Sequence, residues 1–210
     1  MDEKTTHIYN AILDGDVENT EAGVNKALES GLEPGFILAE GMIAAMKEVG
    51  RRFEADEYFV PEMLISAMAM KAGLTVLKPY LVKSEVKSMG TVAIGTVKGD
   101  LHDIGKNLVG LMLEGAGFEV KDLGVDVAPA QFVEAVVAGT VDIVALSALL
   151  TTTMPNMKNT IDALQQAGVR GKVKVMVGGA PVTQEYATLI GADGYSPDAS
   201  QAVKLALTLL

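Results

Sequence analysis

Residues 91–107 read TVAIGTVKGDLHDIGKN, an apolar and β-branched run followed by a polar segment. The run Thr91–Val97 has the composition of a fully buried strand, which is typical of parallel sheets. His102 lies in the polar segment and is one of 2 histidines in a chain without cysteine. If this protein holds a transition metal through nitrogen or sulfur, we therefore expect His102 to be the ligand.

Asp100 precedes His102 by two residues. This spacing lets a carboxylate hydrogen-bond the second imidazole nitrogen, as partners of metal-bound histidines commonly do. A single loop histidine is more often simply solvated, so both interpretations stay open at this point. Lys106 is followed by Asn107, so the phosphate-loop pattern is not met, and the Gly-x-Gly-x-x-Gly dinucleotide pattern is absent as well. We expect His7, the other histidine, to lie in a frayed and functionless N-terminal segment.

From residue 91 onward, β-branched runs alternate with amphipathic segments of helical spacing. The pattern predicts strands at 91–97, 119–123, 141–146, 173–177 and 194–195, and helices at 105–114, 129–138, 155–167, 183–190 and 199–209. Five βα units predict an α/β domain with a flavodoxin-like (Rossmann-like) five-stranded parallel sheet covered on both faces.

Residues 1–88 have helical spacing throughout and predict an N-terminal four-helix bundle. Asp16 is placed to cap a helix over 17–30, a second helix spans 36–54, and Pro61 suits the first turn of a helix over 60–86. Pro79 is expected to kink or interrupt that helix. We expect Met42, Met46, Met68 and Met70 in the bundle core. The polar stretch 83–90 sets the predicted domain boundary, giving 1–88 and 89–210.

Composition excludes several classes of function. The net charge of -10 argues against binding nucleic acid or an anionic membrane. No apolar run approaches the roughly 20 residues that span a bilayer. The N-terminus is acidic and polar, so we expect no signal peptide and a cytoplasmic protein. The absence of cysteine excludes disulfides, cysteine-ligated metal centres and thiol nucleophiles.

Three loops at the carboxyl ends of the predicted strands carry unusual residues: 98–105, the hydroxyl-rich 146–155, and 177–181 with Gly178 and Gly179. Ligands of open α/β sheets bind at this edge. Each loop also has a simpler explanation. The glycine pair suits a turn, and Thr152 or Thr153 suits a helix cap ahead of Pro155.

Taken in order, Asp100-x-His102-x-x-Gly105, Ser147-x-Leu149 and Gly178-Gly179 resemble the three-part signature of cobalamin-binding domains. These domains hold the corrinoid base-off, with a histidine on cobalt. The longer stretch 99–109 resembles the version in methionine synthase and in small corrinoid proteins of methyltransferase systems. The resemblance implies that His102 ligates cobalt and that Asp100 bonds its other nitrogen. It also implies a hydrogen-bonded relay of three side chains, in which a hydroxyl at Thr153 follows His102 and Asp100. The family has serine at the position of Thr153.

The resemblance also implies where the cofactor lies. Its nucleotide tail would enter a slot lined by Ser147, Leu149 and Thr151, with the glycine pair on the opposite wall and Ala199 as a weaker contact. The full set of cofactor residues is then Gly99, Asp100, Leu101, Asp103, Ile104, Gly105, Ser147, Leu149, Thr151, Thr153, Gly178, Gly179 and Ala199. No residue is assigned a catalytic role.

Segments 46–53, 58–64 and 66–70 resemble the helical cap of methyl-carrying corrinoid proteins. The resemblance implies that Phe53, Val60, Met63 and Leu64 cover the upper, methyl-bearing cofactor face. Packing in the bundle core is the alternative for these apolar side chains. The stretch 83–90 is a candidate hinge that would let the cap move aside.

The resemblance implies a methyl carrier that is not catalytic on its own and binds cobalamin as methylcobalamin or cob(I)alamin. Its expected partners are a substrate:corrinoid methyltransferase, a methyl-acceptor methyltransferase acting on a folate or a thiol, and a reductive activase. Two alternatives stay open: the cobalamin subunit of an adenosylcobalamin-dependent isomerase, and a B12-sensing domain. The sequence does not specify the methyl donor.

Overall fold

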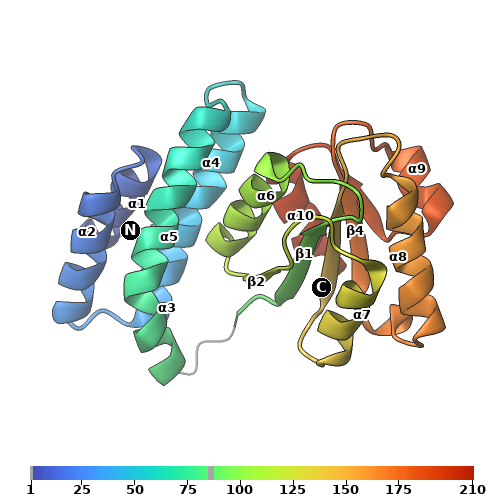
Figure 1. Cartoon of the computed structure of the whole chain (residues 1–210). Coiled ribbons are helices and arrows are strands. Elements are labelled where there is room, and N and C mark those ends of the chain that lie inside the picture. Colours follow the sequence, from blue (N-terminus) through green and yellow to red (C-terminus); the bar gives the residue numbers. More distant parts are fainter. Residues whose placement is uncertain (1, 85–87) are drawn as a thin grey trace. The chain divides into compact units, whose positions relative to one another are not determined.

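The structure is a computed structural model that describes residues 2–84 and 88–210 (Figure 1). It contains two compact units, one formed by residues up to Ser88 and the other by most residues from Met89 onward. The first unit is helical and the second is α/β, as the two sequence periodicities predict. The end of the predicted helix at Val86 and the centre of the proposed hinge fall on residues 85–87, outside the described residues.

The described residues of the helical unit form four helices, counting the continuous run over 34–54 as one, which confirms the predicted bundle. Its elements are α1 (Glu3–Leu13), α2 (Val17–Glu29), a continuous run of α3 (Pro34–Phe36), the π-helical η1 (Ile37–Ile43) and α4 (Ala44–Glu54), and finally α5 (Val60–Lys83). Asp16 caps α2 as predicted, because its carboxylate accepts a hydrogen bond from the Asn19 amide at 2.9 Å. At the start of α5, the Glu62 carboxylate accepts from the Phe59 amide at 2.9 Å.

The core of the helical unit confirms part of the methionine prediction. Met42, Met46 and Met70 are buried, but Met68 is 52% exposed, so its assignment to the core was wrong. Met68 follows Val60 and Leu64 at intervals of four residues along α5, and both of these are exposed too. Side chains at this spacing share one helix face, so these three form an exposed apolar stripe.

Of the two effects expected of Pro79, the interruption does not occur, because helix α5 continues through Pro79 to Lys83. The carbonyl that loses its partner there belongs to Thr75, an exposed residue where water can replace the bond. His7 does not lie in a frayed segment, since it is an exposed residue of α1. Asp2 caps that helix, and the buried Ile8 and Ile12 anchor it.

Helix α5 also meets the length and composition of a membrane span, with a mean hydropathy of 1.4 in its best window. The expectation that no apolar run is long enough was therefore wrong. Its buried residues include Met63, Ala67, Met70 and Leu77, which fall on one face of the helix. The apolar composition of α5 thus suits a helix that packs in the bundle.

The α/β unit confirms the predicted sheet. Strands β1 (Thr91–Thr96), β2 (Glu119–Asp122), β3 (Ile143–Ser147), β4 (Lys174–Gly178) and β5 (Gly194–Ser196) pair in parallel in the order β2-β1-β3-β4-β5. This is the flavodoxin-like order. The helices are α6 (Ile104–Gly115), α7 (Pro129–Val137), α8 (Pro155–Gln166), α9 (Gln184–Ile190) and α10 (Ala199–Leu209), with a short 3-10 turn η2 (Arg170–Lys172).

The strand register determines which loops meet. Thr96 pairs with Ser147, and Ser147 pairs with Gly178, so β1, β3 and β4 end level with one another. Strands β3 and β4 each extend one residue beyond the predicted end. The three loops singled out in the sequence therefore leave the sheet side by side.

Glu48 forms a charged cluster with two arginines of α4. Arg51 donates to the Glu48 carboxylate from Nε and Nη2, both at 2.9 Å, and Arg52 Nε donates at 3.0 Å. Hydrogen bonds from Arg51 and then Arg52 lower the pKa of Glu48 from 4.5 to about 2. A depressed carboxylate pKa stabilises the folded state above pH 4.5, and that stabilisation is lost as the pH falls through about 2.

We predict that Glu48→Gln lowers the free energy of unfolding at neutral pH by about 1 kcal/mol. The difference from wild type should shrink below pH 4.5 and disappear near pH 2. Urea denaturation across this range measures it, with Glu29→Gln at an exposed site of α2 as control. A destabilisation that stays constant with pH would contradict this assignment.

Candidate functional site

The loops after β1 and β3 are joined by hydrogen bonds at the carboxyl edge of the sheet. The Val97 amide donates to the Ser147 carbonyl at 3.0 Å. Within the β1 loop, the Thr96 hydroxyl donates to the His102 carbonyl at 2.9 Å. The loop after β4 joins them, since the Ala148 amide donates to the Gly178 carbonyl at 3.3 Å. The structure therefore brings together the three loops that the sequence predicts.

Asp100 is the centre of this edge. Its side chain is fully buried and accepts hydrogen bonds on both carboxylate oxygens. Oδ1 accepts from the His102 amide at 3.1 Å and faces His102 Nδ1 at 2.7 Å. Oδ2 accepts from the Leu149 amide at 2.8 Å, the Leu150 amide at 3.3 Å and the Thr153 hydroxyl at 2.6 Å. One carboxylate thus joins the β1 loop to the β3 loop.

These hydrogen bonds keep the carboxylate ionised. Burial on its own raises the pKa of Asp100, but hydrogen bonds from Thr153, His102 and the Leu149 amide outweigh burial. The net effect holds the pKa of Asp100 well below its usual value of 3.8. An ionised carboxylate only accepts hydrogen bonds, so the proton between the two groups belongs to His102 Nδ1.

His102 is consequently held in one tautomer, with Nε2 as its remaining nitrogen. The side chain is 51% exposed although its partner carboxylate is buried. Thr153 completes the chain of groups, because its single hydroxyl proton can be donated to Asp100. The β-branched threonine therefore reaches the relay position. Thr153 does not cap α8, whose first turn has no side-chain cap, so that simpler interpretation was wrong.

Apolar side chains lie exposed near the segment 99–106, which contains His102 and is called the histidine segment below. Leu101 and Ile104 are 70% and 82% exposed, and Leu149 and Leu150, whose amides bind Asp100, are exposed as well. Exposed apolar groups gathered in this way favour contact with an apolar surface of a ligand or partner. Leu150 was not among the residues selected from the sequence.

The signature glycines serve different local purposes. Gly179 has a φ of +130°, and a Cβ there would lie 1.9 Å from the Ala148 carbonyl oxygen. A Cβ at Gly178 would lie 3.1 Å from the Ser196 carbonyl oxygen. Close backbone packing therefore requires glycine at 179 and leaves only a tight fit for a larger residue at 178. At Gly105, in contrast, a Cβ would meet no atom within 4 Å. Nothing in the described protein requires glycine there, so the space above it is open to a ligand.

The other selected residues of this unit are spread along the same edge. Asp103 immediately precedes α6, and its carbonyl accepts from the Asn107 amide at 2.7 Å. Ser147 is half-buried and Thr151 is exposed. Gly99 has a φ of +82°. Ala199 is buried at the first turn of α10, next to the capping residue Asp198, and contributes little surface.

The four selected residues of the helical unit differ in exposure. Val60 and Leu64 are exposed, Phe53 is partly buried and Met63 is fully buried. The burial of Met63 agrees with the alternative interpretation of bundle core. Phe59 is strongly exposed beside Val60 and was not selected. An aromatic residue between an acidic loop and a helix-starting proline is the signal that could have found it.

Among the described residues, no group of three or more histidine, aspartate or glutamate side chains could hold a metal ion. A metal at His102 would therefore have to bring most of its own ligands, as a metal in a macrocycle does. The single exposed imidazole, the apolar surroundings and the open space at Gly105 fit such a group.

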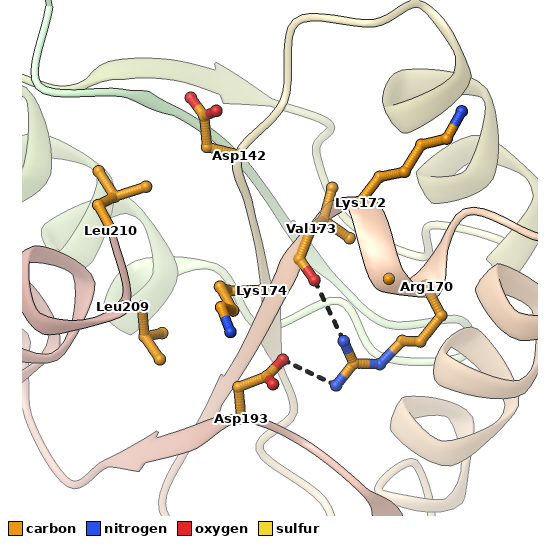
Figure 2. A pocket seen from close by; sticks show the side chains of 9 residues that line it. Asp142, Arg170, Lys172, Val173, Lys174, Asp193, Leu209 and Leu210 are labelled. Atoms are coloured by element: carbon orange, nitrogen blue, oxygen red, sulfur yellow. Dashed lines mark hydrogen bonds and ion pairs between the residues drawn. The ribbon is translucent and has the colours of Figure 1, made fainter.

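A cavity of about 340 Å³ lies at the amino ends of β3 and β4, opposite the carboxyl edge that carries His102 (Figure 2). It is lined by Asp142, which precedes β3, by Lys174 at the start of β4, and by Arg170. The Arg170 guanidinium donates to Asp193 at 2.7 Å and to the Val173 carbonyl at 3.1 Å. Its charge is thus paired within the protein, and the cavity is separate from the His102 site.

Comparison with known proteins agrees with this site. The B12 binding domain family matches residues 90–204, and a second B12 binding domain family matches residues 6–78. Trimethylamine corrinoid protein 2 of Methanosarcina acetivorans is 50% identical over 195 residues, covering 92% of this chain and 90% of the relative. Dimethylamine corrinoid protein 2 of the same organism is 43% identical over 210 residues, covering 100% and 97%.

Solved structures give the same result. A cobalamin-binding protein from Desulfitobacterium hafniense matches with a TM-score of 0.81 at 32% identity, covering 100% of this chain and 99% of that one. A chain of the methanol:cobalamin methyltransferase complex from Methanosarcina barkeri matches with a TM-score of 0.87 at 32% identity, covering 99% and 80%. The chain therefore belongs to the corrinoid proteins with B12 binding domains, and its cofactor is a cobalamin with its cobalt ion.

Proposed function

We propose that this protein is a methyl carrier that holds cobalamin base-off, with His102 Nε2 as the lower ligand of cobalt. The observation that carries the proposal is the half-exposed His102 ring, fixed through Nδ1 by a buried carboxylate at 2.7 Å. When bound, the cofactor supplies a cobalt ion that accepts a methyl group from one partner and releases it to another.

Asp100 has a defined task in this proposal. It keeps the Nδ1 proton of His102 in place, so that Nε2 presents a lone pair to the metal. The hydrogen bonds from Thr153 and the Leu149 amide hold the carboxylate still and ionised. These contacts therefore fix the orientation and the tautomer of the imidazole before the cofactor binds.

The surrounding residues would seat the cofactor. Leu101, Ile104 and Leu149 offer apolar contact beside His102 and would exclude water from it. Ser147 and Thr151 offer hydroxyls for the nucleotide tail. The open space at Gly105 supports passage of the tail on that side.

The helical unit would protect the methyl-bearing face of the cofactor. Its exposed apolar stripe of Val60, Leu64 and Met68, with Phe59 beside it, supports this role. We include Met68 in the proposed cap surface and leave Met63 in the bundle core.

The partners follow from the proteins that this chain resembles. Its relatives are named for trimethylamine and dimethylamine, and a structural match comes from a methanol:cobalamin methyltransferase complex. We propose a methylamine-specific methyltransferase as donor partner, a folate or thiol methyltransferase as acceptor partner, and a reductive activase. Cytoplasmic location stays a prediction. No observation favours the isomerase-subunit or sensor alternatives.

We predict that His102→Ala removes the protein nitrogen from cobalt. In protein labelled with ¹⁵N-histidine and loaded with cob(II)alamin, the nitrogen splitting in the EPR spectrum should change from a triplet to a doublet. His102→Ala should abolish the doublet and weaken cobalamin binding, because it removes the protein ligand of cobalt. His7→Gln, on an exposed position of α1, is the matched control. A triplet in the labelled wild-type protein would contradict the ligand assignment.

Removing the relay hydroxyl should weaken the site without removing the ligand. We expect Thr153→Val to lower cobalamin affinity about 10-fold, because Asp100 loses a buried hydrogen bond. Thr153→Ser should restore wild-type affinity. Thr152→Val changes an exposed neighbouring threonine and should have no effect. Absorbance titration of apoprotein with hydroxocobalamin measures all four proteins. Equal affinity for Thr153→Val and wild type would argue against the relay.

Gly105→Ala should separate folding from cofactor binding. Glycine-to-alanine changes in a compatible backbone stabilise by about 0.5 kcal/mol, so the apoprotein should melt at a slightly higher temperature. The added methyl group enters the space proposed for the cofactor and should lower hydroxocobalamin affinity. A stabilised apoprotein with unchanged affinity would show that the cofactor does not use this space.

A further inference from the structure

Asp126, in the loop between β2 and α7, makes two hydrogen bonds to the histidine segment. Its Oδ1 accepts from the Gly99 amide at 2.6 Å, and its own amide donates to the Asp100 carbonyl at 2.9 Å. The two bonds grip consecutive residues just before His102. They reach the main chain of Asp100, the residue whose side chain holds the imidazole.

Asp126 itself sits in an unusual backbone conformation. Its φ is 52°, in the left-handed region that most side chains avoid and that aspartate and asparagine tolerate best. The neighbouring backbone is fixed to β1, because the Thr96 amide donates to the Gly124 carbonyl at 3.0 Å and the Val127 amide donates to the Thr96 carbonyl at 2.9 Å. Hydrogen bonds to β1 therefore hold the backbone on both sides of Asp126, and this fixes the position from which Asp126 contacts the histidine segment.

A second tie comes from the same part of the chain. Lys106, in the first turn of α6, is buried and donates from Nζ to the Asp122 carboxylate at 2.6 Å and to Asn107 Oδ1 at 2.7 Å. Asp122 ends β2 and Asp126 follows it closely. The segment 99–106, which contains His102, is thus held at both ends by residues 122–126.

We propose that Asp126 is a positioning residue for cobalamin binding, which orients Asp100 and through it His102. This rests on the proposed role of His102 as the cobalt ligand. Gly99, with a φ of +82°, gives the segment a flexible start, so an external hydrogen bond is needed to fix it. The Asp126 side chain supplies this bond, and its backbone N–H fixes the next carbonyl. Since it acts only through the histidine segment, Asp126 needs no contact with cobalt.

The test compares Asp126→Gly with Asp126→Asn. Glycine accepts the left-handed backbone and keeps the amide bond to Asp100 but loses the acceptor for Gly99. Asparagine tolerates the same backbone and keeps a carbonyl acceptor. Losing one hydrogen bond should lower hydroxocobalamin affinity about 5-fold in Asp126→Gly, while Asp126→Asn stays near wild type. The ¹⁵N-histidine EPR doublet should be reduced in Asp126→Gly and restored in Asp126→Asn.

Asp56→Gly is the matched control, since Asp56 has a similar φ of 56° in the helical unit. It should leave both the affinity and the EPR doublet unchanged, and apoprotein melting temperatures check folding throughout. The proposal is overturned if Asp126→Gly matches wild type, fails to fold, or is no worse than Asp126→Asn. If the wild type itself lacks the doublet, the proposed function fails instead.

Discussion

The buried Asp100 carboxylate is the interaction on which the rest of the site depends. It is fully buried, and burial alone would favour its neutral form. Hydrogen bonds from two loops reverse that preference and keep it ionised. The same bonds tie the end of β1 to the end of β3, so removing the charge would loosen the loops as well as release the imidazole. The same hydrogen bonds therefore determine both the charge of Asp100 and the position of the two loops.

The sequence predicts this arrangement where a short spacing controls geometry. Asp100 and His102 lie in one turn, so their contact follows from the chain itself. Thr153 is fifty-three residues away from Asp100, and its contact depends on the parallel register of β1 and β3. The resemblance to cobalamin-binding domains predicts Thr153 as the third member, and the strand register explains why its hydroxyl reaches Asp100.

Other features depend on packing that the sequence does not express. Met68 has the same apolar character as Met70, yet only Met70 faces the bundle core. Pro79 looks like an interruption, but the lost bond falls near the end of α5 at an exposed carbonyl, where it costs little. Asp126 was missed because an aspartate after a strand is typical of any turn, and its importance follows from its partners, Gly99 and Asp100.

The contrast between Gly105 and Gly179 shows how a motif mixes two kinds of constraint. Gly179 is needed before any ligand binds, because a side chain there would collide with the Ala148 carbonyl. Gly105 lies in the first turn of a helix with free space around it, where alanine would suit the fold better. Glycine at 105 therefore lowers the stability of the helix without relieving any contact. Its position beside the exposed His102 is best explained by a ligand that occupies the free space. Hydrogen bonds of Asp126 and Asp100 hold the neighbouring loops in the absence of a ligand, and such preorganisation lowers the entropic cost of binding.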